Sequence, residues 1–455
     1  MKTIFITIFE GIESKNILRT AILPVLLSRA DVRVVLFVKD AARAAYHARE
    51  FHDPRILYEV AEPLCVSGPD ALFVRLKFLL LNTKTTRLRR RMRYEEDGGK
   101  VSYFSASLLQ YLLARPWAVH LARVLDRALV HSETYGGYFE KYHPELLLCA
   151  NLFDEPEVHF LREAKRRGVA VVGLINSWDK ATSRGMLRLL PDRLVVFNGY
   201  LRDDLLRYHA VPADKIFIGG IPQYDQYFSF RPESRSEFFR RLGLDARQRL
   251  IVYSPIGSIC GTADWDIIDM IEQYRREGAF GDGMELLVRF PPNDFVDQKE
   301  IKKRPWLRYQ HPGVRFSEAR GTGIDWDMTF PELEELANTL FHMSMVICYA
   351  SSISVDAAVI DRPVINIGFE LRPRVKGVKS PVQFYRQTHY EKALATGGIH
   401  LAHTREDLVE WVRQYLAHPE CDREGRRRLA TEQCAFLDGK SGERIGAFIL
   451  DFLAA

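Results

Sequence analysis

Two serines and an aspartate beside one apolar run have the types and spacing to bind a nucleotide. Ser351, Ser352 and Asp356 lie in VICYASSISVDAAVIDRPVINIGFE (346–370), where a run of strand length passes into a short helical segment. Because a helix N-terminus presents unpaired N–H groups and a partial positive charge, the serines there can hold a diphosphate. Asp356 follows one turn later, so its carboxylate can accept hydrogen bonds from ribose hydroxyls. The alternative is a capped core helix with a solvated aspartate.

A second reactive group lies in INSWDKATSRG (175–185), directly after the apolar run VAVVGL. Asp179 is our first candidate for a general base that deprotonates an acceptor hydroxyl. Lys180 or Arg184 can balance phosphate charge, and Trp178 offers an indole for an acceptor. The alternative is an ordinary turn in which Asp179 caps the backbone.

The stretch EGIESKN (10–16) follows the first apolar run of the chain. Glu13 is the second candidate for the catalytic base, and Lys15 and Asn16 can contact acceptor or donor. The alternative is a strand-to-helix turn whose charges are solvated. The chain contains no GxGxxG sequence, so the dinucleotide-binding fingerprint is absent.

The sequence Asp-Trp-Asp occurs twice, at 264–266 and at 325–327. Paired aspartates can bind a metal, but both copies precede predicted helices, where acidic residues interact favourably with the helix dipole. We therefore predict that both copies cap helices. We predict that the protein needs no essential metal and no cofactor. Basic side chains and helix N-termini would balance the charge of a bound diphosphate instead.

Length and composition indicate a globular protein of two domains. The chain has 455 residues, 47% hydrophobic and 27% charged, which exceeds what one hydrophobic core usually supports. A net charge of +5 favours acidic partners such as phosphates or an anionic membrane without requiring nucleic acid. Six cysteines without a CxxC pattern are typical of reduced thiols. No segment has the composition of a signal peptide or a membrane span, so we expect the protein in the cytoplasm.

Short β-branched runs alternate with longer amphipathic stretches along the chain, which predicts an α/β fold with parallel sheets. In the first domain, 1–228, the predicted strands are 3–9, 32–38, 145–150, 169–175, 193–198 and 215–220. In the second, 245–455, they are LIVYSP, MELLVRF, VRF, MVICYA and PVINIG. A polar segment separates the two domains. One arrangement left open is that the last helix of the chain packs on the first domain. Ligands of such sheets bind at the carboxyl ends of the strands.

Several of these segments resemble the GT-B glycosyltransferases, especially bacterial surface-polysaccharide enzymes and their CDP-glycerol glycerophosphotransferase relatives. The similarity lies in the Ser-Ser stretch followed by DRPVINI, in RRLGLDARQRLIVYSPIGS, in KIFIGGIPQYDQY and in MELLVRFPPND. It implies two doubly wound Rossmann-like domains facing across a cleft. It also implies a donor site in the second domain, where Ser258 and Arg289 join the serines and Asp356. The chain departs from the family at Phe290 and Pro291, where histidine is common, and at Arg184, where lysine is common.

The resemblance implies a metal-independent glycosyltransferase. Such an enzyme would move a sugar from a nucleotide-diphosphate donor to a hydroxyl of a lipid-linked glycan in surface polysaccharide assembly. Three alternatives stay open: a CDP-glycerol-type glycerophosphotransferase, a non-hydrolysing nucleotide-sugar epimerase, and a non-enzymatic protein that binds polyanions or membranes.

The segment TRLRRRMR (86–93) lies between two apolar stretches, 73–81 and 105–125. Basic residues beside apolar ones suit an amphipathic surface on anionic lipid. The expected contacts are Arg87, Arg89, Arg90, Arg91 and Arg93, and no nucleic acid partner is expected. The alternative is a solvated helix face whose apolar side lies in the core.

Overall fold

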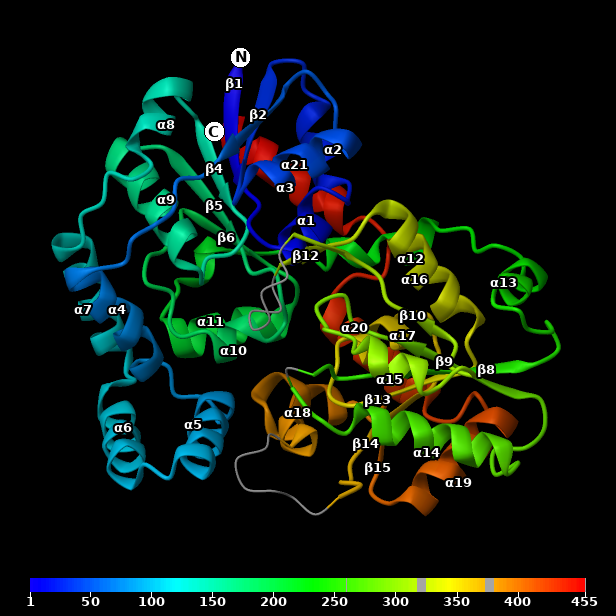
Figure 1. Cartoon of the computed structure of the whole chain (residues 1–455). Helices are drawn as coiled ribbons and strands as arrows, with labels where there is room; N and C mark the ends of the chain where they lie inside the picture. Colours follow the sequence, from blue (N-terminus) through cyan, green and yellow to red (C-terminus); the bar gives the residue numbers. More distant parts are fainter. Residues whose placement is uncertain (259, 317–324, 373–379, 455) are drawn as a thin grey trace. The chain divides into compact units, whose positions relative to one another are not determined.

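The computed structural model of the chain describes residues 1–258, 260–316, 325–372 and 380–454 (Figure 1). The chain forms two compact units. Unit 1 comprises Met1–Tyr94, Gly98–Asp225 and Cys434–Ala455, and unit 2 comprises Glu95–Asp97 and Gln226–Gln433. Among the described residues, no helix is both long enough and apolar enough to cross a membrane.

A seven-stranded parallel sheet forms the centre of unit 1, in the order β3-β2-β1-β4-β5-β6-β7 (Figure 1). Its strands are β1 (Lys2–Thr7), β2 (Val32–Val38), β3 (Ile56–Val60), β4 (Leu146–Cys149), β5 (Ala170–Leu174), β6 (Arg193–Val196) and β7 (Ile216–Ile218). The six predicted strands are confirmed. The edge strand β3 was not predicted, because its residues are half-buried and lack a continuous apolar run.

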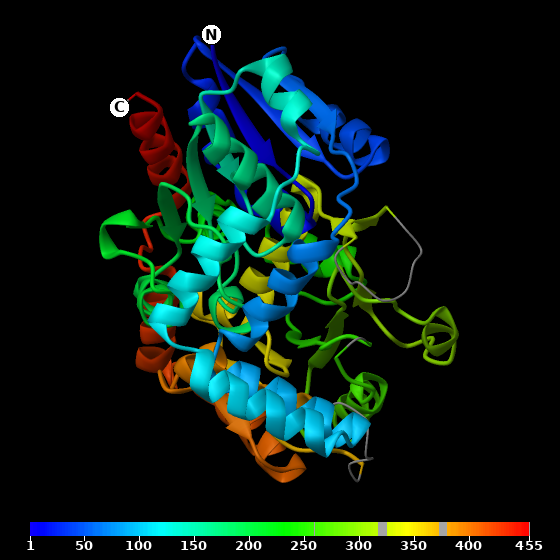
Figure 2. The ribbon, with the colours of Figure 1, turned by 90° about the vertical axis from the view of Figure 1, so that its left-hand side faces the viewer.

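Helices of unit 1 connect successive strands. They are α1 (Gly11–Ile17), α2 (Ile22–Leu27), α3 (Ala41–Glu50), α8 (Gly136–Tyr142), α9 (Glu155–Arg167), α10 (Lys180–Ser183) and α11 (Gly199–His209). Four more helices, α4 (Gly68–Leu79), α5 (Lys84–Asp97), α6 (Lys100–Leu113) and α7 (Pro116–Leu129), lie between β3 and β4 in the sequence (Figure 2). We call these four helices the insertion.

The last helix, α21 (Ser441–Ala454), belongs to unit 1 and packs on α2 (Figures 1 and 2). The carboxylate of Asp225 accepts hydrogen bonds from the backbone N–H groups of Ser441 and Gly442, which fixes the start of α21. Gly446 permits the close approach, because a Cβ there would lie 2.8 Å from the Cβ of Val25. Unit 1 is therefore assembled from distant parts of the sequence.

Unit 2 contains a six-stranded parallel sheet in the order β10-β9-β8-β13-β14-β15. Its strands are β8 (Arg249–Ser254), β9 (Met284–Arg289), β10 (Tyr309–Gln310), β13 (Met345–Cys348), β14 (Val364–Ile367) and β15 (His400–Ala402). The predicted strand VRF does not join this sheet: β11 (Val314–Arg315) instead pairs antiparallel with β12 (Trp326–Asp327). Both strands have only two residues. A sequence pattern that short cannot indicate which strand each one pairs with, or in which direction.

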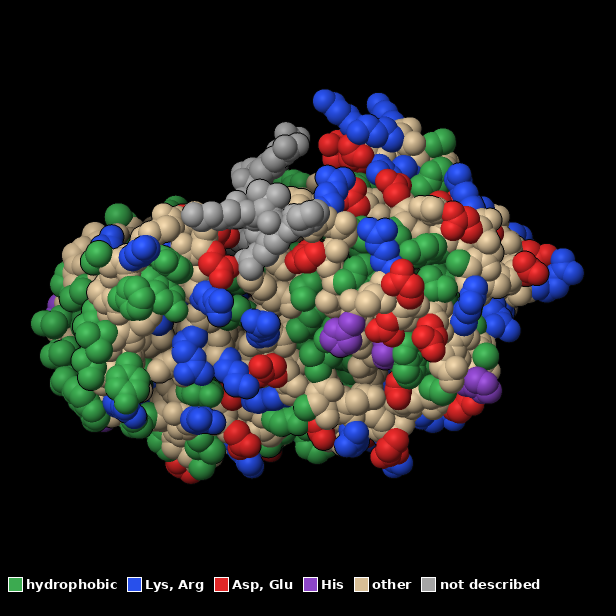
Figure 3. Space-filling model, turned by 90° about the horizontal axis from the view of Figure 1, so that it is seen from below, with side chains coloured by type: hydrophobic (Ala, Val, Ile, Leu, Met, Phe, Trp, Pro, Cys, Tyr) green, Lys and Arg blue, Asp and Glu red, His purple; other side chains and the backbone are tan. Residues whose placement is uncertain are grey.

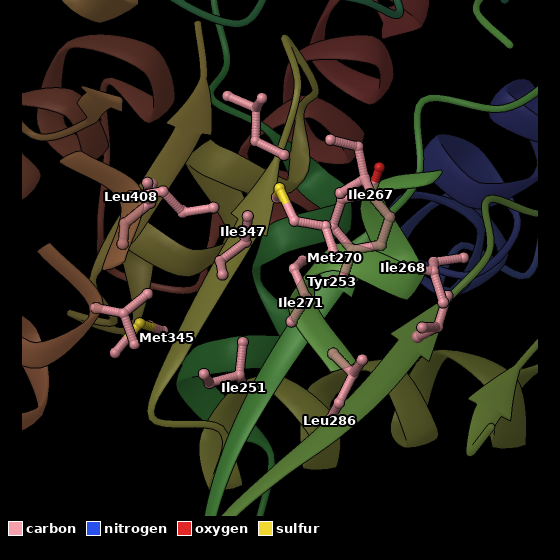
Figure 4. Packing of buried hydrophobic residues seen from close by; sticks show 14 of the residues in the cluster. Ile251, Tyr253, Ile267, Ile268, Met270, Ile271, Leu286, Met345, Ile347 and Leu408 are labelled. Atoms are coloured by element: carbon pink, nitrogen blue, oxygen red, sulfur yellow. The ribbon is translucent and has the colours of Figure 1, made fainter. Parts of the chain in front are cut away.

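The helices of unit 2 alternate with its strands. They are α12 (Gln226–Ser229), α13 (Arg235–Arg241), α14 (Asp264–Arg276), α15 (Gln298–Lys302), α16 (Phe330–His342), α17 (Ile353–Val359), α18 (Thr388–Leu394), α19 (Arg405–Ala417) and α20 (Arg423–Cys434). Side chains from β8, β9, β13, α14 and α19 form one buried core (Figure 4). The two sheets confirm the predicted α/β fold with two Rossmann-like domains.

Each sheet has a point where the strand order reverses. In unit 1 the chain runs from β1 outward to β3 and then returns to β4 on the other side of β1. In unit 2 it runs from β8 outward to β10 and then returns to β13 on the other side of β8. Loops at the carboxyl ends of the strands separate at such a point and leave room for a ligand. Candidate functional residues are therefore those that follow β1 and β4, and those that follow β8 and β13.

Candidate functional site

Three carboxylates meet where the strand order of unit 1 reverses. Glu10 and Glu13 follow β1, and Asp154 follows β4. One oxygen from each of the three lies within 4.8 Å of the others. We call these three residues the carboxylate group. Asp179 is not a member of it.

Glu13 is the most buried member of the carboxylate group, with no exposed surface. Its Oε2 accepts hydrogen bonds from the backbone N–H groups of Phe9 and Glu10, whereas its Oε1 is buried without a hydrogen-bond partner. Burial, and next the negative charge of Glu10, raise the pKa of Glu13 to about 8. Glu13 can therefore exchange a proton near neutral pH, which is the property of a general acid or base.

Lys180 provides positive charge beside the carboxylate group. Its Nζ lies 3.5 Å from Oε2 of Glu10, and both side chains are largely buried. Burial raises the pKa of Glu10, and the ammonium of Lys180 opposes that rise. The loop after β5 thus contributes a cation to carboxylates that follow β1 and β4.

Asn16 and Asn176 add buried polar atoms that point to a missing ligand. The Nδ2 of Asn16 donates to the carbonyl oxygens of Ile12 and Asn176, while its Oδ1 has no partner. Both side-chain polar atoms of Asn176 are buried without a partner. Because buried polar groups are nearly always hydrogen-bonded, unpartnered atoms at strand ends indicate where a substrate or water would bind.

Glu157 lies in the first turn of α9, in the same region. It is fully buried, and its Oε2 accepts a hydrogen bond from the N–H of Asn151. Burial, and next the charge of Glu13, raise the pKa of Glu157 well above its usual range. A protonated Glu157 would limit the negative charge near Glu13.

The other residues predicted for unit 1 are placed differently. Asp179 accepts hydrogen bonds from the hydroxyls of Ser177 and Ser183, so its loop folds much as the turn alternative expects. Trp178 and Lys15 are half-buried, and Arg184 is exposed at the end of α10. The roles predicted for these residues stay predictions.

Two features of the unit 1 site were missed from the sequence. The start of a helix within EGIESKN was not located: α1 begins at Gly11, and its turns carry Glu13, Lys15 and Asn16. Asp154 was not recognised, although an acidic residue directly after the predicted strand 145–150 was an available signal. The carboxylate group also has the ligand types of a metal site. The metal-independent reaction stays a prediction.

In unit 2, Ser351 and Ser352 follow β13 and precede α17 as predicted. Ser352 is exposed, and Ser351 is half-buried. Asp356 is buried, and the hydroxyl of Tyr227 donates to its Oδ1 at 2.5 Å. The ribose-binding role of Asp356 therefore requires a ligand to share this carboxylate with Tyr227.

The loop after β8 is held by two buried aspartates. Asp264 accepts hydrogen bonds from the N–H groups of Ile256 and Gly257 and from the hydroxyl of Tyr253. Ser258 donates its N–H and its hydroxyl to Oδ1 of Asp294, at 2.8 and 2.7 Å. The side chain of Ser258 is exposed, yet its hydroxyl hydrogen is already donated.

The helix-capping prediction for the two Asp-Trp-Asp copies holds in part, because Asp264 and Asp266 lie in the first turn of α14, whereas Thr329 is the residue that caps α16. Asp264 begins α14, but its carboxylate holds the preceding loop instead of the helix N-terminus. The second copy overlaps the strand β12, and Oδ1 of Asp327 accepts a hydrogen bond from the N–H of Met328 at 2.6 Å. Both copies therefore organise loops.

Arg289 ends β9 and is almost completely buried. It donates a hydrogen bond to Oε1 of Gln310 at 2.6 Å. Burial lowers the pKa of Arg289 to about 10. Burial raises the pKa of Tyr227, and the positive charge of Arg289 opposes that rise. The donor-binding roles predicted for Arg289, Ser351 and Ser352 stay predictions.

Comparisons with known proteins identify the class of fold. No protein-family model matches the chain, and no curated protein matches it in sequence. Three solved structures are similar along the whole chain at 11–13% identity. MnaA from S. aureus, solved with UDP, has a TM-score of 0.54 and covers 100% of this chain and 97% of its own. UDP-GlcNAc 2-epimerase from Neisseria meningitidis, bound to UDP-GlcNAc, has a TM-score of 0.52 and coverages of 99% and 100%.

The wall teichoic acid polymerase TagF has a TM-score of 0.50, with 13% identity, and covers 100% of this chain and 89% of its own. At such low identity these similarities define the fold alone. The chain has the GT-B type of fold, as the sequence resemblance implied.

Proposed function

We propose that the protein is a GT-B glycosyltransferase that moves a sugar from a nucleotide-diphosphate donor to an acceptor hydroxyl. The observation that carries this proposal is Glu13, a buried carboxylate with one unpartnered oxygen and a pKa raised to about 8, at the strand-order reversal of unit 1. A hydroxyl nucleophile needs a base that can accept its proton near neutral pH.

In the proposed reaction, Oε1 of Glu13 accepts the proton of the acceptor hydroxyl. The hydroxyl oxygen forms a bond to the anomeric carbon, and the bond from that carbon to the nucleotide diphosphate breaks. Lys180 and Glu10 set the field around Glu13, since their charges act on its pKa in opposite directions. Glu13 replaces Asp179 as the leading candidate, because the carboxylate of Asp179 is already bound by two serine hydroxyls.

Unit 2 would bind the donor. Ser351 and Ser352 are accessible at the end of β13 and would contact the diphosphate that leaves. Ser258, Asp356 and Arg289 complete the proposed donor site. These three side chains are already held by hydrogen bonds within the protein. Polar groups that are held in place need little reorganisation when a charged ligand binds, which favours its binding. The acceptor would be a lipid-linked glycan of surface polysaccharide assembly, elongated in the cytoplasm at the membrane face.

A nucleotide-sugar epimerase is the second candidate, and one observation favours it. Three carboxyl groups within 4.8 Å can supply both the acid and the base that inversion of a sugar carbon needs. The similar structures solved with UDP and UDP-GlcNAc agree with this chemistry. The similarity to TagF supports a CDP-glycerol transferase as a third variant.

The test is thermal stabilisation by UDP, GDP, dTDP, CDP and CMP compounds, followed by product analysis with the preferred nucleotide sugar. A ligand at about 100 times its dissociation constant stabilises the folded state by roughly 2.7 kcal/mol. Transfer only with an acceptor supports the glycosyltransferase, and conversion of the donor alone supports the epimerase. A preference for CDP-glycerol supports the third variant, whereas no stabilisation by any nucleotide overturns the proposal.

A further inference from the structure

Helix α6 exposes the side chains that a globular protein normally buries. Its one buried residue is Gln110, whose amide donates to the carbonyl oxygens of Phe78 and Leu81. Its exposed residues instead include Val101 (83% exposed), Phe104, Leu108, Leu109, Tyr111 and Leu112. The spacing 101, 104, 108, 111/112 is that of one helical face. This apolar stripe therefore points to solvent and the polar contact points inward.

Helix α7 shows a second outward stripe. Ala118, Val119 and Ala122 face inward, so α7 packs normally on its inner side. Its outer side nevertheless carries five large apolar residues: Trp117 (61% exposed), Leu121, Val124, Leu125 and Leu129. Of the 23 large apolar residues exposed in the described part of the chain, 13 lie between Leu72 and Leu129. Single exposed apolar residues are ordinary, but a group of this size marks an interaction surface.

The charge around these stripes is strongly positive. Residues 84–129 contain ten lysines and arginines against four acidic residues, a net charge of +6 in a chain whose total is +5. The one acidic residue of α6 and α7 is Asp126, which is buried and paired with Arg162 and Arg188. In Figure 3 hydrophobic side chains gather at the left end of the molecule, with Lys and Arg side chains next to them.

We propose that the outer faces of α6 and α7, with the exposed basic residues beside them, dock on an anionic lipid membrane. We call this the docking surface. Aromatic residues with a polar atom, such as Trp117 and Tyr111, suit the interface between headgroups and acyl chains. Basic residues attract anionic headgroups, and apolar stripes insert at the acyl boundary. The proposal rests on these observations and is independent of the reaction proposed above.

A protein partner fits these observations less well than lipid does. A second copy of the chain would bring one net charge of +6 against another, since the same surface would face itself. An anionic membrane can bind both the apolar stripes, through its acyl chains, and the basic residues, through its headgroups.

The structure also refines which arginines take part. Arg89 donates to the carbonyl oxygen of Ser183, and Arg90 donates to Ser107 and Gln110, so both have structural contacts. Arg87 and Arg93 are exposed on α5 and are the better candidates for lipid contact. For α6, the alternative of a helix with its apolar side in the core is wrong.

The test is flotation of the purified full chain with vesicles of phosphatidylcholine alone, or with 30% phosphatidylglycerol, in the absence of substrate. The apolar variant is Phe104→Ser with Leu108→Ser, and the charge variant is Arg87→Glu with Arg93→Glu. Leu206→Ser and Arg49→Glu are matched controls, because both residues are exposed in unit 1 outside the docking surface. Melting temperatures show that each variant is folded.

We expect the wild type and both controls to float with the anionic vesicles. The charge variant should bind at least about thirtyfold more weakly, because each lost arginine contributes about 1 kcal/mol, and the difference should shrink at high salt. The apolar variant should lose binding at both salt concentrations. Absence of wild-type binding overturns the proposal, as does full binding by the folded apolar variant. A wild-type oligomer that becomes monomeric in the apolar variant overturns it in favour of self-association. Failure of vesicle binding leaves the proposed reaction standing, because no turnover is measured.

Discussion

The two units share a type of sheet but differ in how their polar residues at the strand ends are used. In unit 1, Glu13, Asn16 and Asn176 have buried atoms without partners, and carboxylates lie close together. In unit 2, Asp264 and Asp294 hold the loop after β8, while Ser352 is exposed and Ser351 is half-buried. Buried carboxyl groups that lie close together raise one another's pKa values. Carboxylates that accept several hydrogen bonds from a loop hold the conformation of that loop. In the proposed function, proton transfer therefore belongs to unit 1 and donor binding to unit 2.

The largest expected effect comes from Glu13→Gln, which removes the proposed base and keeps the side chain's size. We expect turnover to fall by about 10²- to 10⁴-fold, the usual contribution of general acid–base catalysis. Nucleotide binding, measured by calorimetry, should change little. Asp179→Asn is the matched control. If Asp179→Asn lowers turnover as much as Glu13→Gln does, the assignment of the base to Glu13 is wrong.

The next prediction concerns pH. If Glu13 acts as the base, turnover should rise with pH and level off above about pH 8, where its carboxylate is ionised. The folded-state pKa lies above the unfolded value of 4.5, so ionisation of Glu13 destabilises the fold. Relative to Glu13→Gln, the wild type should therefore lose stability as pH rises from about 4.5 to 8. The measurement is the melting temperature of both proteins as a function of pH. The same pH dependence in both would contradict the raised pKa of Glu13.

In unit 2, Ser351→Ala with Ser352→Ala should weaken nucleotide binding. Hydrogen bonds to a charged group contribute about 1.5–3 kcal/mol, so the dissociation constant should rise roughly 10- to 100-fold. Calorimetric titration with the preferred nucleotide measures this effect. Ser236→Ala, an exposed serine on α13, should bind normally. Unchanged affinity in the double variant would remove the serines from the donor site.

The smallest expected effect is a loss of stability from crowding the contact between α21 and α2. This change lies in unit 1, so it should leave ligand binding by unit 2 unchanged. Gly446→Ala would place a Cβ 2.8 Å from that of Val25, and such overpacking costs about 1–3 kcal/mol. Gly137→Ala on α8 meets no atom within 4 Å and should be neutral or slightly stabilising. Denaturant unfolding followed by circular dichroism measures both. Equal stability of the two variants would show that α21 does not pack tightly on α2.

The sheets could be predicted from the sequence because buried parallel strands are nearly continuous runs of β-branched residues. The strands β3, β10 and β15 were missed, since they are short or half-buried and lie near or at sheet edges. Glu13 could be selected because it follows the first strand. Its pKa could not be predicted, because it depends on burial and on neighbours from distant segments.

Asp154 illustrates the same limit at the site. It lies 141 positions from Glu13 in the sequence, and only the adjacency of β1 and β4 brings the two together. Helix α6 shows a different limit. Its amphipathic pattern is plain in the sequence, but a pattern does not state which face is buried. The polar contacts of Gln110 decide that question in the folded chain.

The position of α21 has a consequence for the order in which the chain folds during synthesis. Unit 1 requires both β1 and α21, whereas nearly all of unit 2 is one continuous segment, Gln226–Gln433. Domains fold as units while the chain leaves the ribosome. Unit 2 can therefore complete its core first, while the sheet of unit 1 waits for α21 to cover it. During that interval the face of α2 that α21 later covers stays exposed to solvent.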